Sequence, residues 1–396
     1  MHGERDPNPK MNLHPGLSFS RDEYLRRYRL VMDGIRKAGV DALLVRGPEN
    51  ITYLTGYETP GYYGYHCLIL VPGESPVLVG RRLEVGTNVP EFSWLTEVAP
   101  VEDDEVPVEV TIRTLSRMGL ARKRLGIESE SWFLTVNEHQ ALAGALPHAT
   151  LVDCSSVIEE ARMIKSAEEV DVIRQAVAIA DRACLAGIRA TRPGTTEDRI
   201  AAAVYKEWCE AGAEYTGLPN FIVSGPRSGA CHATWRGRRL EDDDHCCFEI
   251  AASKHRYCGA VFRMATVGRV NPRLRQLSDA QNRAIQEVID AIRPGAVSEE
   301  VDQVGRDVIA KAGFGKWHVS RLGYSIGINY PPDWGEGQII SIRQGEKRRL
   351  RENMTFHLVA GVLIPGEFGS GSSASVRVTA TGCEVMTSLP LQLYEN

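Results

Sequence analysis

Apolar and polar positions alternate with helical and strand periods in the first part of the chain. Residues 20–39 repeat apolar side chains at three- and four-residue spacing, start with a serine that has a glutamate three positions on, and end at a glycine. This pattern predicts a capped helix. Short apolar runs at 41–47, 66–73 and 76–80 end at glycine or proline and predict strands. Together these elements indicate an α/β domain over 19–162.

A second set of elements follows from residue 163. Ser166 and Glu169 form a second capping-box pattern ahead of an apolar helical stripe. An RPG turn precedes a helical pattern twice, either through internal duplication or because RPG is a good helix-entry turn. Three apolar segments predict strand pairs: 247–268, 354–366 and 375–387. Helices outside long antiparallel strands predict an α+β catalytic domain over 163–396.

Composition narrows the class of protein. The chain of 396 residues has 46 Lys+Arg against 51 Asp+Glu, a net charge of −5, so it has no basic surface of the kind that nucleic acid requires. No apolar run approaches the roughly 18 residues of a membrane span. Residues 1–18 are polar and rich in Pro and Gly, which predicts a disordered lead and no secretory signal. The nine cysteines contain no CxxC pair. We therefore expect a cytoplasmic protein with free thiols.

Seven segments follow one another in a recognisable order and spacing: MIKSAEEVDVIRQAVAIAD, the two RPG-led helices, EIAASKHRYCGAVFRMATVG, GYSIGINYPPDWGE, NMTFHLVAG and VTATGCEVMT. They resemble the creatinase/aminopeptidase P family, which is the M24 family with the pita-bread fold. The resemblance covers nearly the whole chain and implies a creatinase-like N-terminal α/β domain before a pita-bread catalytic domain. It also implies a small-molecule substrate and a homodimer with the site near the subunit interface.

The resemblance also locates the five ligands that hold two metal ions in metal-dependent members. These positions fall at Glu249, Ala260, Tyr324, Val359 and Ser373. Divalent cations need several oxygen or nitrogen ligands, and only the glutamate among these residues is a usual one. We therefore expect no catalytic metal and no other cofactor.

Two branches of the family, creatinase and ectoine hydrolase, are metal-free and cleave a C–N bond at an amidine- or guanidine-like carbon. The similarity is greater to ectoine hydrolase, which opens a cyclic amidine. It implies a metal-independent hydrolase of a small cyclic amidine. Three alternatives remain open: a creatinase-like amidinohydrolase, an Xaa-Pro peptidase-like metallohydrolase, and a non-catalytic ligand-binding protein. The acid-free segment 369–376 departs from ectoine hydrolases and favours the same reaction on another substrate.

Glu249 is the central catalytic candidate. It interrupts the apolar stretch CCFEIAA, where a glutamate is not expected without a partner. A buried carboxylate pairs with an amidinium and acts as nucleophile or as general base, and the sequence leaves both roles open. The structural alternative is an ion pair with Arg263 or Lys254.

Other candidates surround it. His232 lies in a loop at the position of the acid–base of creatinase. Glu336 ends PPDWGE and is placed to hold the second amidine nitrogen, with Asp333 as its competitor. Trp334 offers an aromatic wall to a cation.

The remaining candidates bind substrate. Tyr324 donates a hydrogen bond into the volume left by the metals, and its alternative role is to fill space. His357 lies two strand positions before Val359, which stands where metal-dependent members have a glutamate ligand. Residues two apart on a strand share a face, so His357 is a second acid–base candidate. The last candidates are Tyr62 or Tyr65, which would cap the ligand of a partner subunit, and, for a substrate carboxylate, Arg263, Arg227 or Arg236.

Overall fold

The computed structural model describes residues 8–396 and consists of two compact units, Met1–Arg162 and Met163–Asn396. Residues 1–7 of the predicted disordered lead lie outside the described part. Residues 8–18 form no helix or strand, but the Asn12 amide donates to the Trp94 carbonyl at 2.8 Å and His14 bonds the Ser93 carbonyl at 3.1 Å. This stretch is therefore tethered to its own unit.

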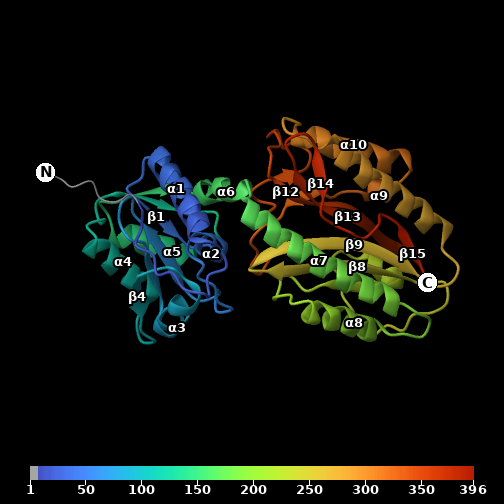
Figure 1. Ribbon diagram of the computed structural model, residues 1–396, viewed down its shortest axis with the longest axis horizontal. Helices are drawn as coiled ribbons and strands as arrows, with labels where there is room; N and C mark the ends of the chain where they lie inside the picture. Colours follow the sequence, from blue (N-terminus) through green and yellow to red (C-terminus); the bar gives the residue numbers. More distant parts are fainter. Residues whose placement is uncertain (1–7) are drawn as a thin grey trace. The chain divides into compact units, whose positions relative to one another are not determined.

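The first unit is a six-stranded mixed sheet with helices packed on it (Figure 1). The strand order is β4-β3-β2-β1-β5-β6, with antiparallel pairing only between β1, β2 and β3. Its elements are α1 Arg21–Ala38, β1 Ala42–Val45, α2 Pro48–Thr55, β2 His66–Leu70, β3 Val77–Arg81, α3 Arg82–Phe92, β4 Glu97–Val101, α4 Pro107–Arg117, β5 Arg124–Ile127, α5 Val136–Ala145, β6 Thr150–Asp153 and α6 Ser156–Met163.

The cap signals predicted for α1 are present in this unit. Ser20 Oγ accepts the Glu23 amide at 3.2 Å, and Gly39 ends the helix at φ 66°, a left-handed conformation that glycine adopts without strain.

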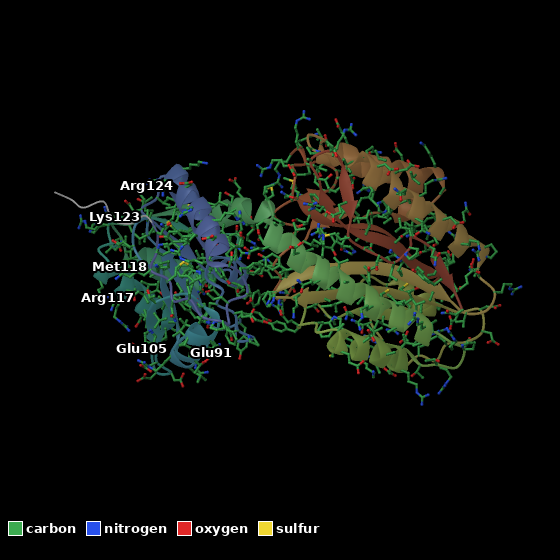
Figure 2. The ribbon with its side chains drawn as sticks, in the orientation of Figure 1. Glu91, Glu105, Arg117, Met118, Lys123 and Arg124 are labelled. Atoms are coloured by element: carbon green, nitrogen blue, oxygen red, sulfur yellow. The ribbon has the colours of Figure 1, made fainter. Side chains whose placement is uncertain are left out.

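The charged side chains of Arg117, Lys123 and Arg124 project from the outside of the unit (Figure 2).

The second unit places four long helices on two sheets. One sheet has the order β15-β9-β8-β7 and the other β11-β10-β12-β13-β14. The elements are α7 Ala167–Ala190, α8 Glu197–Glu210, β7 Phe221–Ser224, η1 Gly225–Gly229, β8 His245–Lys254, β9 Tyr257–Thr266, α9 Pro272–Ala291, α10 Ser298–Lys311, η2 Gly315–Trp317, β10 Gly323–Ser325, β11 Ser341–Ile342, β12 Thr355–Ile364, β13 Phe368–Val378, β14 Cys383–Val385 and β15 Leu393–Glu395.

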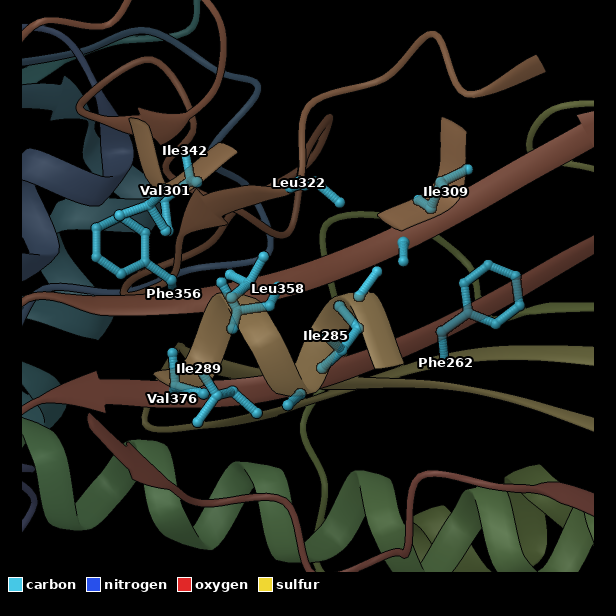
Figure 3. Packing of buried hydrophobic residues seen from close by; sticks show 14 of the residues in the cluster. Phe262, Ile285, Ile289, Val301, Ile309, Leu322, Ile342, Phe356, Leu358 and Val376 are labelled. Atoms are coloured by element: carbon cyan, nitrogen blue, oxygen red, sulfur yellow. The ribbon is translucent and has the colours of Figure 1, made fainter. Parts of the chain in front are cut away.

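The helices cover the outer faces of both sheets. The α7 helix packs on β8 and β9, and α9 packs on β12 and β13 (Figure 1). Figure 3 shows Ile285 and Ile289 of α9 against Leu358 of β12 and Val376 of β13, all buried. Burying each such side chain contributes about 1.5–3 kcal/mol. The helix-covered faces of the two sheets form the hydrophobic cores. A functional site is therefore expected on the faces that the helices do not cover. The α+β prediction is confirmed.

Details of the second unit both match and correct the sequence prediction. The Ser166–Glu169 capping box is complete, with both hydrogen bonds formed. Both RPG turns place their glycine, Gly194 or Gly295, at positive φ. The segment 354–366 was predicted as a strand pair, which is wrong, because β12 is one continuous strand that pairs with β13. No helix among residues 8–396 has the length and apolarity to cross a membrane.

Candidate active site

Glu249 lies in the middle of β8 with its side chain turned away from α7 and α8. Its neighbours Phe248 and Ile250 are buried under those helices, and strand alternation directs Glu249 to the opposite face. There it is in register with Phe221 of β7 and Phe262 of β9. Glu249 stays partly exposed while its strand neighbours are buried, so its carboxylate is surrounded by protein yet reachable.

The pKa of Glu249 is raised to about 7, first by burial and then by the negative charge of Asp333. Within residues 8–396 its carboxylate has no hydrogen bond or ion pair, and neither Arg263 nor Lys254 reaches it. The structural alternative considered for this residue is therefore wrong. A carboxyl group with such a pKa exists in both protonation states near neutral pH, which suits proton transfer.

Asp333 supplies the second carboxylate of the site. Its Oδ1 accepts the backbone amides of Trp334 at 2.7 Å and Gly335 at 3.1 Å, so the loop itself orients the carboxylate. Asp333 is partly exposed, and its charge acts on Glu249. The two carboxylates repel each other unless a cation lies between them.

Aromatic rings form the wall of the site. Trp334 is buried and its ring centroid lies 5.2 Å from that of Phe221. Both residues belong to a small apolar cluster on the Glu249 face of the sheet. Aromatic faces attract organic cations, so this wall and the two carboxylates favour the same kind of ligand.

A chain of hydrogen bonds connects Trp334, Tyr324 and His357. The indole Nε1 of Trp334 donates to Tyr324 Oη at 2.8 Å, and Tyr324 Oη lies 2.8 Å from His357 Nδ1. The indole can only donate, so the Tyr324 oxygen accepts from Trp334, whereas the Tyr324–His357 hydrogen bond runs in the direction that the histidine tautomer sets. Burial lowers the pKa of His357 to about 3, with a smaller effect from Arg263. His357 is therefore neutral at physiological pH, which argues against its predicted acid–base role.

His232 stacks on Phe221, the residue directly across from Glu249. The ring centroids are 5.1 Å apart with an interplanar angle of 20°. His232 is exposed and adopts φ 54°, in the left-handed region that a histidine rarely occupies. Phe221 therefore lies next to both His232 and Glu249, and the catalytic role expected for His232 stays a prediction.

A buried carboxylate that the sequence did not single out holds this loop. Glu197, the first residue of α8, is fully buried and accepts the amide and hydroxyl of Ser224, each at 2.8 Å. It also accepts from Arg227 at 2.9 Å and from the Arg236 amide at 2.7 Å, and Arg227 in turn donates to the Thr234 carbonyl. Glu197 thus ties both ends of the loop that carries the stacked histidine.

Glu336 has a different role from the one predicted. Its carboxylate is buried in an ion pair with Lys165 at 2.8 Å and also accepts the Ile328 amide at 3.1 Å. Both charged side chains are only 1% exposed. These contacts correct its predicted role at the substrate, because they anchor the loop that presents Asp333 and Trp334 instead.

Arg263 is not available to a substrate carboxylate, which corrects the prediction. The side chain is 1% exposed and belongs to β9. Its guanidinium donates to four backbone carbonyls: those of Pro390 at 3.0 Å, Phe262 at 2.7 Å, Ser373 at 2.8 Å and Leu389 at 2.5 Å.

Tyr62 and Tyr65, the two candidates for capping a partner's ligand, differ in how far their side chains are engaged within the first unit. Tyr65 bonds Thr111 Oγ1 at 2.7 Å, and the Arg46 guanidinium lies 3.8 Å from its ring centroid. Tyr65 is therefore engaged within its own unit, which argues against a capping role. Tyr62 is partly exposed beside Phe133, at a centroid distance of 6.0 Å.

The donor set does not fit a two-metal centre. Among residues 8–396, no group of three or more His, Cys, Asp or Glu side chains could hold a metal ion. At one of the five ligand positions inferred from the resemblance, Ser373 Oγ instead accepts the Phe262 amide at 2.6 Å. Nearby, Ser375 Oγ donates to the Ala260 carbonyl at 2.8 Å. The serines of β13 therefore tie down the backbone of β9.

A mixed α/β unit followed by a unit of two sheets with helices on their outer faces is the architecture of the two-domain hydrolases that have a pita-bread catalytic domain. Residues 27–164 match the Creatinase/Prolidase N-terminal domain, and residues 171–380 match Metallopeptidase family M24. The chain belongs to the M24 family, and the predicted fold class is confirmed.

Relatives within the family differ in activity. An uncharacterized hydrolase/peptidase of Sinorhizobium fredii is 32% identical over 95% of this chain and 97% of its own length. The ectoine hydrolase of Halomonas elongata is 26% identical over 96% and 98%. A prolidase from Thermococcus sibiricus, with a TM-score of 0.84 and 23% identity over 96% of this chain and all of its own, matches in fold.

Proposed function

We propose that this protein is a metal-independent hydrolase that cleaves a C–N bond of a small cyclic amidine, as in the ring opening of ectoine. The observation that supports it best is the pair formed by Glu249 and Asp333, two carboxylates close enough to interact electrostatically and without a cationic side chain on Glu249 among residues 8–396. A protonated amidine is a planar cation that two carboxylates can hold together.

The chemistry follows from the same residues. Asp333 and the ionised Glu249 hold the amidinium, and Trp334 covers it. A water oxygen forms a bond to the amidine carbon while Glu249 takes one proton from that water. The ring C–N bond then breaks, its electron pair stays on the nitrogen, and that nitrogen takes this proton from Glu249. The second proton of the water leaves the added oxygen as the amide carbonyl forms and also ends on the amine, so amidinium and water give an amide and an ammonium group. His232 lies at the same wall and assists the proton transfer. In the alternative course Glu249 attacks the carbon itself, and water hydrolyses the adduct.

Metal independence rests on the donor set. Ala260 and Val359 offer no ligand atom, the Tyr324 hydroxyl is engaged by Trp334 and His357, and the Ser373 hydroxyl is engaged by β9. A peptidase reaction of the kind carried out by metal-dependent relatives would lack its ligands here.

The test is turnover without metal. Protein treated with a strong chelator and passed through a desalting column is incubated with ectoine, hydroxyectoine and creatine, and ring opening or urea release is followed by NMR. We expect unchanged turnover of a cyclic amidine after chelation and loss of turnover in Glu249→Gln. Turnover of creatine alone would assign a creatinase-like amidinohydrolase.

Two outcomes would contradict the proposal. Two transition-metal ions per chain by elemental analysis, with cleavage of Xaa-Pro dipeptides that is lost on chelation, would assign a metallopeptidase. Tight ligand binding without turnover, unaffected by Glu249→Gln, would assign a binding protein. We further propose a cytoplasmic homodimer, which sedimentation velocity would test for the assembly.

A further inference from the structure

Arg321 is a guanidinium at the site that no sequence pattern indicated. Its central carbon lies 4.8 Å from the ring centroid of Tyr324. On its other side is Gly337, where a Cβ atom would come within 2.8 Å of both terminal nitrogens. The arginine is thus held between an aromatic face and a stretch of bare backbone, and only a residue without a side chain at 337 leaves it this room.

Its hydrogen-bonding capacity is unused. Within residues 8–396, Arg321 has no ion pair or hydrogen bond, and its side chain is partly exposed. Of the other arginines considered for an anion, Arg263 donates to backbone carbonyls and Arg227 is paired with Glu197, whereas Arg236 is exposed and bonds Glu197 through its backbone amide. An arginine presents five N–H donors in a planar fork that matches a carboxylate.

The charges of the site are separated. Burial raises the pKa of the Tyr324 hydroxyl well above its usual range and the charge of Glu249 adds to this effect, whereas Arg321 lies against the ring of the same tyrosine. Neither Glu249 nor Asp333 forms an ion pair with Arg321 in the described part of the chain. A negative end and a positive end therefore coexist in one site without neutralising each other.

We infer that Arg321 binds a carboxylate of the substrate, so that the site selects a small zwitterion with an amidinium at Glu249 and Asp333 and a carboxylate at Arg321. Tyr324 is the residue that links the two ends, because Arg321 lies against its ring and the charge of Glu249 acts on its hydroxyl. This inference rests on the proposed function and adds the second charged group that the substrate must carry.

The experiment compares two substrates in two variants. The substrates are ectoine and the methyl-substituted tetrahydropyrimidine that lacks its carboxylate. In Arg321→Met we expect kcat/KM for ectoine to fall roughly 10- to 100-fold, the range for a charge-assisted hydrogen bond, and kcat/KM for the ring without carboxylate to stay within about twofold. Arg321→Lys should recover part of the loss, since an ammonium keeps the charge without the planar fork. Arg199→Met, which removes an exposed arginine of α8, is the matched control and should leave both values unchanged.

The outcomes separate this inference from the proposed function. Arg321→Met could lower turnover of both rings by the same factor, or of neither. In either case Arg321 does not bind the substrate carboxylate, and the hydrolase proposal stands. If the wild-type protein turns over neither ring, calorimetric titration of both compounds decides. Weaker binding of ectoine alone to Arg321→Met would support the anion subsite while refuting the hydrolase. Equal binding of ectoine to both proteins, or none to either, would overturn the inference.

Discussion

The hydroxyl oxygen of Tyr324 lies 2.8 Å from Nδ1 of His357 and accepts the indole N–H of Trp334 at the same distance. One oxygen therefore joins two buried nitrogens. The tyrosine at a position inferred to hold a metal ligand is the middle member of a buried hydrogen-bonded chain.

Removing that link leaves two buried groups without partners. In Tyr324→Phe the Trp334 indole and His357 Nδ1 both lose their bond, which should cost about 1–3 kcal/mol for each orphaned group. Nitrogen NMR of His357 should show a changed Nδ1 resonance, because that atom loses its partner. Denaturant unfolding gives the loss of stability. A variant as stable as wild type, with an unchanged Nδ1 resonance, would show that neither nitrogen depends on the tyrosine hydroxyl.

Glu249→Gln should affect stability in a pH-dependent way. The pKa of Glu249 is about 7 in the folded protein and about 4.5 when unfolded, so the folded state binds this proton more tightly. Wild-type stability therefore falls as pH rises from about 4.5 to about 7, by an amount on the order of 2 kcal/mol after allowing for partial exposure. The variant has no such group.

The measurement is thermal unfolding of both proteins at pH 5 and pH 8. We expect the variant to gain a few degrees relative to wild type at pH 8 and little at pH 5. The same difference at both pH values would mean that the carboxyl group of Glu249 does not titrate as described.

Glu197→Gln tests the anchoring of the His232 loop. Its matched control is Asp302→Asn in α10, which also removes a buried carboxylate that bonds an arginine and a backbone amide. We expect both variants to lose stability on the order of 3 kcal/mol. Only Glu197→Gln should lower kcat, roughly 10- to 100-fold.

A purely structural role for Glu197 would give equal kcat losses in the two variants at matched stability. The second readout is proton NMR of the His232 ring, whose resonances are shifted by stacking on Phe221. These resonances should move in Glu197→Gln and stay in Asp302→Asn.

Replacing only Lys165 of the buried Lys165–Glu336 pair should destabilise the protein more than replacing both residues. Lys165→Met alone removes the ammonium that lies 2.8 Å from the buried Glu336 carboxylate and should cost about 3–5 kcal/mol. The double variant Lys165→Met/Glu336→Leu should recover most of that loss, as judged by denaturant unfolding. A double variant less stable than the single one would show that Glu336 stabilises the loop mainly through its bond to the Ile328 amide.

Local patterns predicted the elements well because their causes are local. The capping box at Ser166 and the glycine stop at Gly39 act over a few residues, and both are present. The mid-strand position of Glu249 followed from its apolar neighbours. The absence of an ion pair at Glu249 among the described residues did not follow from the sequence. It depends on the direction in which the basic side chains of the whole unit point.

The site residues that the sequence missed depend on long-range contacts. Glu336 looked like a substrate ligand because its partner Lys165 is 171 positions away in the chain. Arg321 gave no signal, since its importance comes from Tyr324 and from the missing side chain at Gly337. No short-range periodicity carries such information.

The serine hydroxyls that secure β9 have a consequence for redesign. A side chain placed at residue 373 must still accept the Phe262 amide that Ser373 now satisfies, because a stranded buried amide costs about 1–3 kcal/mol. A carboxylate turned toward a cation would leave that amide without its acceptor. Building a cation site here would therefore require a second change that holds the neighbouring strand.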